Sequence, residues 1–374
     1  KNDDPELLDD MDIDSPEVVS LLQKRQASST KTLLKIVWPP PNADQDEDGS
    51  MDGSMSLMTD EPSPVIPVHI FLSQEQFTRD GASHGTNRSS AAHVDYAMYT
   101  TKNTTENKYV TKKVLHKFVF HSKIVPLLPK VDAKLHFKTC AIVSNSGMLL
   151  REQYGPEIDA TDAVFRINYP PILGFQRFVG SKCTFEVTNL HHAQLIADNN
   201  HPLVPKGSRN FRTPRGKKTG GNATLVIIES TNSDGWRFHM IPKLLQHFRP
   251  PRTALLSPDF VVAAEEVWQR VYDAVDVNGT SKCREMMRRA VRDKSASNQG
   301  MCKPTSGWFT LLFASQICDE VRMYGFSDWK KHGGSAQPKY HYFDDVMGVT
   351  NVHSFDMSLK VYQMLGKYYN IQVM

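Results

Sequence analysis

The feature that most constrains the fold is the alternation of short apolar runs with helical patterns after residue 109. Five runs, at 139–144, 163–168, 224–229, 253–256 and 321–325, are mostly apolar on consecutive positions, as is typical of strands buried on both faces. Helical patterns occur at 148–154, 261–275, 308–319 and 358–369. This alternation favours an α/β domain with a mostly parallel sheet, in which ligands bind beyond the carboxyl ends of the strands.

Charge divides the chain into an acidic leader and a basic body. The 374 residues carry 44 Lys and Arg against 41 Asp and Glu, but residues 1–61 hold 15 acidic and only 5 basic side chains. Low hydrophobicity combined with like charge prevents collapse, so we expect a disordered acidic leader over 1–62. A stem or linker over 63–108, in which 65–72 can form an edge strand, then precedes one folded domain over 109–374.

Cysteines, glycosylation sequons and apolar runs leave the compartment open. The five cysteines fit either two disulfides and one thiol or five thiols. Each sequon accepts a glycan only if the chain enters the secretory pathway, and sequons occur at Asn87, Asn103, Asn222 and Asn278. The longest apolar runs are far shorter than the roughly 18–20 residues that span a bilayer. The basic segment 206–218 is either a solvated loop or a site for an anionic ligand.

The segment CAIVSNSGMLLREQYGPEIDATDAVFRIN, residues 140–168, carries the first chemical signal. It predicts a strand, a small polar turn at 145–147 and a helix, and such turns present N–H groups that attract phosphate. The chain contains neither GxGxxG nor GxxxxGK[ST]. A dinucleotide-binding oxidoreductase and a Walker nucleotide site are therefore disfavoured.

Longer motifs in the same region resemble those of the eukaryotic sialyltransferase family. CAIVSNSG, GPEID, DAVFRIN, GF and VGSKCTF, within 140–189, resemble its large motif, and PTSGWFTLLFASQICDEVRMYGF at 304–326 resembles its small motif. HYFD at 341–344 resembles the third motif, and VHSF at 352–355 the start of the very small motif. The four motifs stand in the family's order across the folded body, and the resemblance does not extend to residues 1–100.

The resemblance implies a single Rossmann-like α/β domain, a GT-A variant, with a mostly parallel central sheet flanked by helices. It also implies an inverting glycosyltransferase that moves sialic acid, or a related keto-acid sugar such as Kdo, from its CMP donor to a hydroxyl of a glycan. Such an enzyme uses no metal or other cofactor, and its acceptor is a glycoprotein, a glycolipid or a polysaccharide rather than a nucleic acid. We accordingly expect a Golgi-lumen, type II membrane protein whose anchor lies outside this chain.

Site residues follow from matching each motif position to the family. His353 matches the general base, and an imidazole with an ordinary pKa near 6.5 suits proton transfer near neutrality. His341 matches the histidine that contacts the departing phosphate. The resemblance also implies five donor-binding residues, two amides and a short turn before a helix: Asn145, Asn168, Thr305, Ser306 and Gly307.

The resemblance also gives the cysteines a meaning. Cys140 and Cys318 match a family disulfide that joins the large and small motifs, and such a bond implies an oxidising lumen. A second bridge between Cys283 and Cys302, with Cys183 left as a thiol, is our further hypothesis.

Three departures from the family pattern affect the site. Ser144 replaces the usual glycine of the first turn, Glu186 stands where a basic or polar residue is common, and Ser358 replaces the glutamate of the very small motif. Asp356 is a nearby carboxylate at a different spacing. The missing glutamate leaves a second interpretation open, a weakened or inactive relative that binds nucleotide or glycan as a scaffold, whereas the two histidines favour the enzyme.

Overall fold

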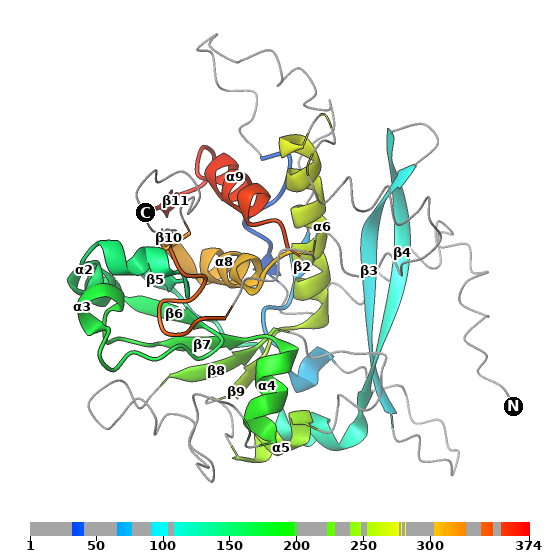
Figure 1. Ribbon diagram of the computed structural model, residues 1–374. Helices are drawn as coiled ribbons and strands as arrows, with labels where there is room; N and C mark the ends of the chain where they lie inside the picture. Colours follow the sequence, from blue (N-terminus) through cyan, green and yellow to red (C-terminus); the bar gives the residue numbers. More distant parts are fainter. Residues whose placement is uncertain are drawn as a thin grey trace, which may run out of the picture.

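A parallel sheet forms the centre of the molecule (Figure 1). The computed structural model describes residues 32–40, 66–76, 91–103, 108–198, 200, 223–228, 240–247, 253–276, 278, 281, 303–326, 338–346 and 353–374. Seven strands pair in the order β11-β10-β5-β6-β7-β8-β9, and every neighbouring pair is parallel. The predicted α/β class with a mostly parallel sheet is confirmed.

The strands of this sheet match the predicted runs closely. Predicted runs became β5 (Phe137–Val143), β6 (Ala163–Ile167), β8 (Thr224–Ile227), β9 (Thr253–Leu255) and β10 (Cys318–Tyr324). The apolar pattern did not predict β7 (Phe185–Thr188) or β11 (Ile371–Val373). In β7 all four residues are buried, but Glu186 and Thr188 interrupt the hydrophobic run, so the pattern was invisible.

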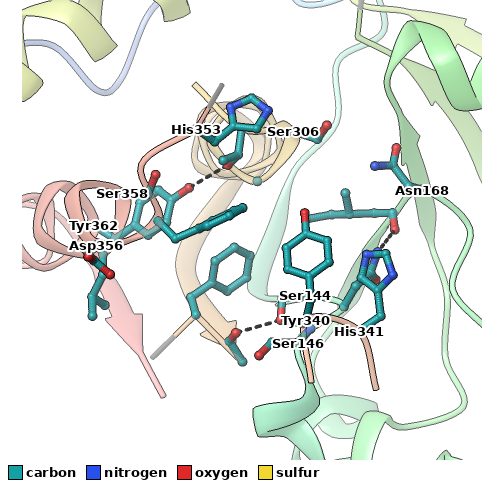
Figure 2. A pocket seen from close by; sticks show the side chains of 18 of the residues that line it. Ser144, Ser146, Asn168, Ser306, Tyr340, His341, His353, Asp356, Ser358 and Tyr362 are labelled. Atoms are coloured by element: carbon teal, nitrogen blue, oxygen red, sulfur yellow. Dashed lines mark hydrogen bonds between the residues drawn. The ribbon is translucent and has the colours of Figure 1, made fainter. Parts of the chain in front are cut away.

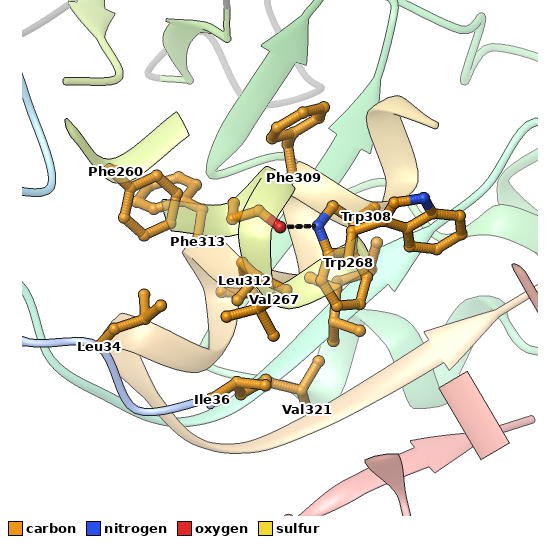
Figure 3. Packing of buried hydrophobic residues seen from close by; sticks show 14 of the residues in the cluster. Leu34, Ile36, Phe260, Val267, Trp268, Trp308, Phe309, Leu312, Phe313 and Val321 are labelled. Atoms are coloured by element: carbon orange, nitrogen blue, oxygen red, sulfur yellow. Dashed lines mark hydrogen bonds between the residues drawn. The ribbon is translucent and has the colours of Figure 1, made fainter. Parts of the chain in front are cut away.

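One face of the sheet is covered by α8 (Ser306–Ile317), against which α6 (Pro258–Val275) packs, and α9 (Phe355–Leu365) packs against α6. Almost every side chain of α8 is buried, because the helix lies between the sheet and α6 (Figure 3). The Trp308 indole fills this core and donates its Nε1–H to the carbonyl of Ala264, 2.8 Å away. A buried aromatic side chain contributes about 1.5–3 kcal/mol, so this layer anchors the start of α8.

The opposite face is covered by shorter elements. The 3₁₀ helix η5 (Gly147–Arg151), α2 (Gly155–Ala160) and α3 (Gln176–Val179) follow β5 and β6. The predicted helix 148–154 is instead this 3₁₀ turn followed by a separate helix, because Gly155-Pro156 starts α2 afresh. Farther along the sheet, α4 (Leu190–Ala197), α5 (Met240–His247) and η4 (Ser122–Leu127) pack together.

Two segments expected to belong to the leader and linker are part of the folded core. Residues 32–40 contain β1 (Thr32–Leu33), which pairs with β2 (Pro67–Val68), and η3 (Gln74–Gln76) follows. Apolar side chains from 34–38 and 66–71 are buried in the same cluster as α6 and α8. The leader and linker boundaries are therefore wrong for these segments. The acidic composition of the leader concealed the apolar run LLKIVW, whereas the strand expected within 65–72 is present as β2.

A long hairpin also begins inside the predicted linker. β3 (Ala91–Asn103) pairs antiparallel with β4 (Lys108–His121), and Figure 1 shows it beside α6, apart from the central sheet. The predicted start of the folded domain at residue 109 therefore cuts through paired strands. No helix among the described residues is long and apolar enough to cross a membrane.

The order of the strands creates a crevice beside β5. From β5 the chain steps outward to β9, returns through α6 and α8, and places β10 on the other side of β5. Loops from the carboxyl ends of β5 and β10 thus leave in opposite directions, which is the switch point where open α/β sheets bind ligands.

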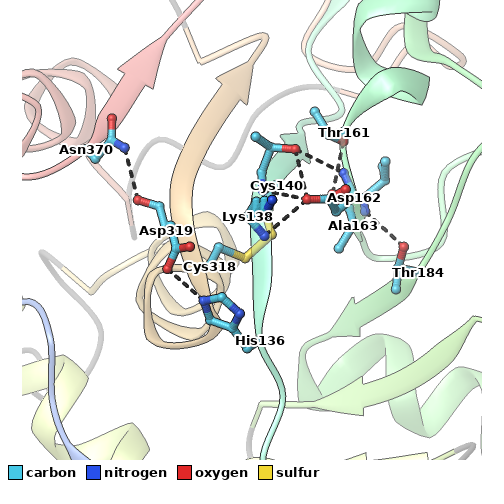
Figure 4. Close-up of a disulfide and its surroundings, with 12 residues drawn as sticks. His136, Lys138, Cys140, Thr161, Asp162, Ala163, Thr184, Cys318, Asp319 and Asn370 are labelled. Atoms are coloured by element: carbon cyan, nitrogen blue, oxygen red, sulfur yellow. Dashed lines mark hydrogen bonds and ion pairs between the residues drawn. A yellow bond between two sulfur atoms is a disulfide. The ribbon is translucent and has the colours of Figure 1, made fainter.

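The predicted disulfide is present, and it joins the middle of β5 to the start of β10 (Figure 4). Cys140 of β5 is bonded to Cys318, the first residue of β10, with Cα atoms 6.2 Å apart. Around it, His136 Nε2 lies 2.8 Å from Asp319 Oδ1, and the Asn370 amide donates to the Asp319 carbonyl at 3.0 Å. The bond ties the end of α8 directly to the strand that carries the large motif.

Candidate active site

A cavity of about 220 Å³ opens at the switch point, beyond the carboxyl ends of β5, β6, β7 and β10. All seven residues predicted to be catalytic or donor-binding line it, although they come from five separate parts of the chain: Asn145, Asn168, Thr305, Ser306, Gly307, His341 and His353. Figure 2 shows their labelled members grouped around a common space. The structure therefore brings together every predicted catalytic and donor-binding residue, while their chemical roles stay predictions.

The turn after β5 forms the floor of the cavity. Ser144, which replaces the usual glycine, donates its hydroxyl to the Gly325 carbonyl at 2.8 Å and accepts the Ser146 N–H at 3.2 Å. Its side chain thus ties the end of β5 to the end of β10. Asn145 donates Nδ2–H to the Ile167 carbonyl at 3.0 Å, and its buried Oδ1 has no hydrogen-bond partner among the described residues. This oxygen therefore has a free acceptor position beside the cavity.

The chain after β6 turns through two strained residues. Asn168 and Tyr169 have φ angles of 59° and 61°, the left-handed region, where each non-glycine residue costs about 1–3 kcal/mol. Hydrogen bonds hold the pair: the Asn168 N–H donates to the Val187 carbonyl at 2.9 Å, and Asn168 Oδ1 accepts the Asn189 N–H at 3.1 Å. The turn places the Asn168 amide at the cavity.

Asn189 was missed by the sequence interpretation, although it lines the cavity. It caps α4 by accepting the His192 N–H at 3.0 Å, and its Nδ2 lies 3.5 Å from the Ser306 hydroxyl. The available signal was an asparagine at a strand-to-helix step, as at Asn145, but it depended on recognising β7.

The beginning of α8 forms a second wall. Thr305 is the N-cap residue, and its hydroxyl lies 3.2 Å from the Tyr362 hydroxyl of α9. Burial raises the pKa of Tyr362 to about 12, so the phenol is protonated at neutral pH. A Cβ on Gly307 would lie 2.8 Å from the Phe326 ring, so the glycine permits this packing.

His341 is held by a carboxylate. Its Nδ1 lies 2.9 Å from Asp344 Oδ1, and its ring stacks on Phe343 at a centroid distance of 4.9 Å. Because a carboxylate accepts hydrogen bonds, Asp344 orients the imidazole with Nδ1 protonated. Gly147 brings this segment close, because its N–H donates to the Lys339 carbonyl at 3.0 Å and a Cβ there would lie 2.7 Å from that oxygen.

His353 lies on the opposite side of the cavity, just before α9. Its Nδ1 is 2.9 Å from the Lys303 carbonyl oxygen. Because a carbonyl only accepts, Nδ1 carries the proton, and in the neutral ring Nε2 is the basic nitrogen. This is the tautomer that a general base requires if Nε2 faces the acceptor.

The position of the missing glutamate is buried and locally bonded. Ser358 lines the cavity, and its hydroxyl donates to the Ser354 carbonyl one turn earlier in α9, at 2.9 Å. Asp356 also lines the cavity but is exposed. Among the described lining residues, Asp356 and Lys339 are the two with permanent charges, and Lys339 forms an exposed ion pair with Asp345 at 2.6 Å.

The remaining predicted residues lie away from the cavity or outside the described residues. Cys183 is a buried thiol whose Sγ lies 3.7 Å from Glu186 Oε2. Asn278 is exposed, and Asn103 is the last residue of β3. The predictions that lie outside the described residues are the sequons at Asn87 and Asn222, the Cys283–Cys302 bridge and the basic segment 206–218. Within the described ranges, no three His, Cys, Asp or Glu side chains form a group that can hold a metal ion.

Three relatives show how far the similarity extends. The first relative is CMP-N-acetylneuraminate-beta-galactosamide-alpha-2,3-sialyltransferase 1 from Gallus gallus. It is 26% identical over 231 residues, which cover 60% of this chain and 54% of that protein. Beta-galactoside alpha-2,6-sialyltransferase 2 from Danio rerio is 28% identical over 212 residues, 54% of this chain and 35% of that protein. A human alpha-N-acetyl-neuraminyl-2,3-beta-galactosyl-1,3-N-acetyl-galactosaminide alpha-2,6-sialyltransferase is 27% identical, covering 55% and 60%.

This chain thus spans between about a third and three fifths of the length of these relatives. A crystal structure of a mammalian sialyltransferase superposes with a TM-score of 0.40 at 19% identity, covering 67% of this chain and 72% of that one. The model of glycosyltransferase family 29 (sialyltransferase) matches residues 83–368, well over half of the chain. The chain therefore belongs to glycosyltransferase family 29, the sialyltransferases.

Proposed function

We propose that this protein is an inverting glycosyltransferase that moves sialic acid from its CMP donor to a hydroxyl of a glycan acceptor. The oxygen of the acceptor attacks the anomeric carbon, the bond from that carbon to the phosphate oxygen breaks, and CMP leaves with the electron pair. His353 Nε2 takes the proton of the attacking hydroxyl. A transfer of this kind needs a positioned base and a stabilised leaving group more than it needs covalent chemistry.

The observation that carries the proposal is that two histidines with different hydrogen-bond partners lie around one cavity. The carbonyl partner of His353 keeps a proton on Nδ1 and leaves Nε2 free to accept one, whereas the partner of His341 is a carboxylate that carries a negative charge beside the ring. The first arrangement suits a base, and the second suits a group that donates a proton or positive charge to a departing phosphate. Pairs of titratable groups with contrasting surroundings are a common basis for acid and base assignments.

The walls of the cavity suit a nucleotide monophosphate. The buried Asn145 Oδ1 is an acceptor for a ribose hydroxyl or a base amino group, and Asn168 and Asn189 supply further amides. Backbone N–H groups and hydroxyls at the start of α8 favour an anion, here the phosphate or the carboxylate of the sugar. We assign donor binding to Asn145, Asn168, Thr305, Ser306 and Gly307.

Several finer features belong to the same proposal. We expect transfer without a metal ion, an acceptor on a glycoprotein, a glycolipid or a polysaccharide, and a site of action in the Golgi lumen. The relatives support sialic acid as the donor sugar through their names, and Kdo is the alternative keto-acid sugar. The Cys140–Cys318 disulfide is consistent with an oxidising lumen.

The test measures CMP release from CMP-sialic acid and CMP-Kdo, with and without a panel of glycans and with EDTA in one arm. We expect acceptor-dependent release from CMP-sialic acid that EDTA does not reduce. His353→Ala should lower kcat by about 10²–10⁴-fold with CMP binding retained, the usual contribution of a general base. His191→Ala is the matched control, because His191 is an exposed histidine on α4 that does not line the cavity.

A nucleotide-binding scaffold is the second candidate, favoured by Ser358, whose hydroxyl is bonded within α9 where the family motif has a carboxylate. No turnover of either donor, together with intact CMP binding, would establish the scaffold and reject the enzyme. Full activity of His353→Ala would reject only the assignment of the base.

A further inference from the structure

A buried glutamate lies directly behind the nucleotide-facing turn of β6. Glu186 is on β7 with 1% of its surface exposed, and its Oε1 accepts the N–H of Tyr169 at 2.5 Å. Its other oxygen lies 3.7 Å from the Cys183 thiol. Glu186 does not line the cavity, so it does not act on a ligand directly.

The donor of this hydrogen bond, Tyr169, is the second residue of a strained pair. Asn168 and Tyr169 both have left-handed φ angles, and neither is a glycine. Such backbone persists only where the surroundings determine it more strongly than the local preference opposes it. Tyr169 is itself 2% exposed, so in this conformation its N–H would be left buried without an acceptor if the Glu186 carboxylate were removed.

Two further hydrogen bonds at this turn act on Asn168. The Asn168 N–H meets the Val187 carbonyl, and Asn168 Oδ1 meets the Asn189 N–H. Both partners are on or just after β7, the strand that carries Glu186. These three bonds hold the left-handed turn against β7, and the one from Glu186 acts on the Tyr169 N–H.

We propose that Glu186 is a positioning residue whose buried carboxylate, by accepting the Tyr169 N–H, holds the left-handed turn that presents Asn168 to the ligand. Substrate contacts stay with Asn168. The inference rests on the proposed function only in taking the ligand to be CMP.

The experiment compares CMP dissociation constants and melting temperatures of the wild type, Glu186→Met and Glu186→Gln. Met keeps the volume but removes the acceptor, so we expect CMP binding to weaken about tenfold, within the range for an unsatisfied buried N–H. Gln keeps an oxygen at the same reach, and we expect it to bind CMP within about threefold of the wild type. Should Glu186→Met not fold, Glu186→Asp is the substitute, because it withdraws the carboxylate by one methylene and should also weaken binding.

A stability control separates positioning from general loosening. Val226→Ala removes buried volume from β8, away from the cavity, and should lower the melting temperature while leaving CMP affinity within about twofold. Wild-type affinity in Glu186→Met, or in Glu186→Asp where Met does not fold, overturns the proposal.

A crystal structure of the folded variant, Met or Asp, makes the outcome independent of the ligand. We expect Asn168 and Tyr169 to leave the left-handed region, and their retention of φ angles near the present 59° and 61° would overturn the proposal. If the wild type does not bind CMP, the proposed function fails, but this structural comparison still decides the role of Glu186.

Discussion

The two sides of the cavity are held in different ways. The strand-end side, formed by the turns after β5, β6 and β7, is fixed by hydrogen bonds that link one strand end to the next: Ser144 to the Gly325 carbonyl, Asn145 to the Ile167 carbonyl, and the Asn189 N–H to Asn168 Oδ1. The histidine side, formed by the segments around His341 and His353, is half-buried like these amides, and among the described residues each ring has one polar partner, a carboxylate or a carbonyl. Under the proposed function, the amides held by these bonds face the nucleotide, and the two histidines face the reacting bond.

This difference separates binding from chemistry. Amides that hold a nucleotide work best when their orientation is fixed in advance, because binding then costs little ordering. A proton-transfer group needs a defined tautomer and access to its partner, which one hydrogen bond and partial exposure provide. Substitutions on the strand-end side should therefore change affinity, and those on the histidine side should change kcat.

The largest expected effect is on the free energy of unfolding, through the disulfide that joins β5, a strand of the strand-end side, to β10. Cys140→Ala combined with Cys318→Ala should lower the free energy of unfolding by about 3–5 kcal/mol, because the disulfide closes a loop of 178 residues. Denaturant unfolding under oxidising conditions measures the change. Cys183→Ala is the control, since Cys183 is a thiol and closes no loop. Equal stability of the wild type and the double variant would show that the sheet alone holds β5 against β10.

The next effect tests the histidine side. His341→Ala should lower kcat by about 10²–10³-fold, while CMP affinity changes less than about threefold. Asp344→Asn should lower kcat about tenfold, because it removes the carboxylate that holds the imidazole through Nδ1. His136→Ala is the matched control: His136 is also paired with an aspartate, at 2.8 Å, but lies outside the cavity. A large loss of CMP affinity in His341→Ala would place this histidine among the binding groups instead.

On the strand-end side, the sequence predicted most of the strands but not every residue that lines the cavity. Runs of buried residues identified β5 and β6, and the motif resemblance placed Asn145 and Asn168 beside the ligand. Recognition failed at β7, where Glu186 broke the apolar run, and Asn189 was lost with it. The left-handed turn at Asn168 was also unpredictable, because a single sequence carries no signal for backbone strain that distant contacts impose.

On the histidine side and in the upstream segments, the sequence predicted single residues or single strands but not what they contact. His341 and His353 were identified only through motifs, since a lone histidine has no periodicity to mark it. Their partners, Asp344 and the Lys303 carbonyl, became visible only in three dimensions. Residues 32–40 were hidden because composition averaged over an acidic leader conceals a few apolar side chains that a distant core buries. The strand within 65–72 was expected from its apolar run, but the run carries no signal that its side chains join the same core.

A moderate effect is expected from an amide on the strand-end side. Asn168→Ala should weaken CMP binding about tenfold, because it removes an amide at the cavity and the bond to the Asn189 N–H. With CMP-sugar saturating, kcat should fall less than about threefold, which distinguishes it from His341→Ala. Asn370→Ala is the control, since its amide bonds the Asp319 carbonyl away from the cavity. An unchanged dissociation constant with a low kcat would remove the proposed division between the two sides.

The smallest expected effect lies where the two sides meet, at the hydroxyls of Thr305 and Tyr362. Tyr362→Phe should lower the free energy of unfolding near neutral pH by about 1 kcal/mol and weaken CMP binding less than about threefold. Since burial raises the pKa of Tyr362 to about 12 from 10, the unfolded state releases this proton first, and wild-type stability falls as pH rises from 10 to 12.

Tyr362→Phe has no phenol to ionise, so its free energy of unfolding does not fall for this reason. The difference in stability between the wild type and Tyr362→Phe should therefore shrink or reverse between pH 10 and 12 in parallel unfolding measurements. Tyr369→Phe is the control for affinity, because Tyr369 bonds Val37 outside the cavity. A deficit that stays constant from pH 8 to 12 would mean that the Tyr362 phenol ionises as readily in the folded protein as in the unfolded chain. Water would then reach the Tyr362 hydroxyl between α8 and α9, and Thr305 would not belong to the part of the cavity that buried hydrogen bonds hold.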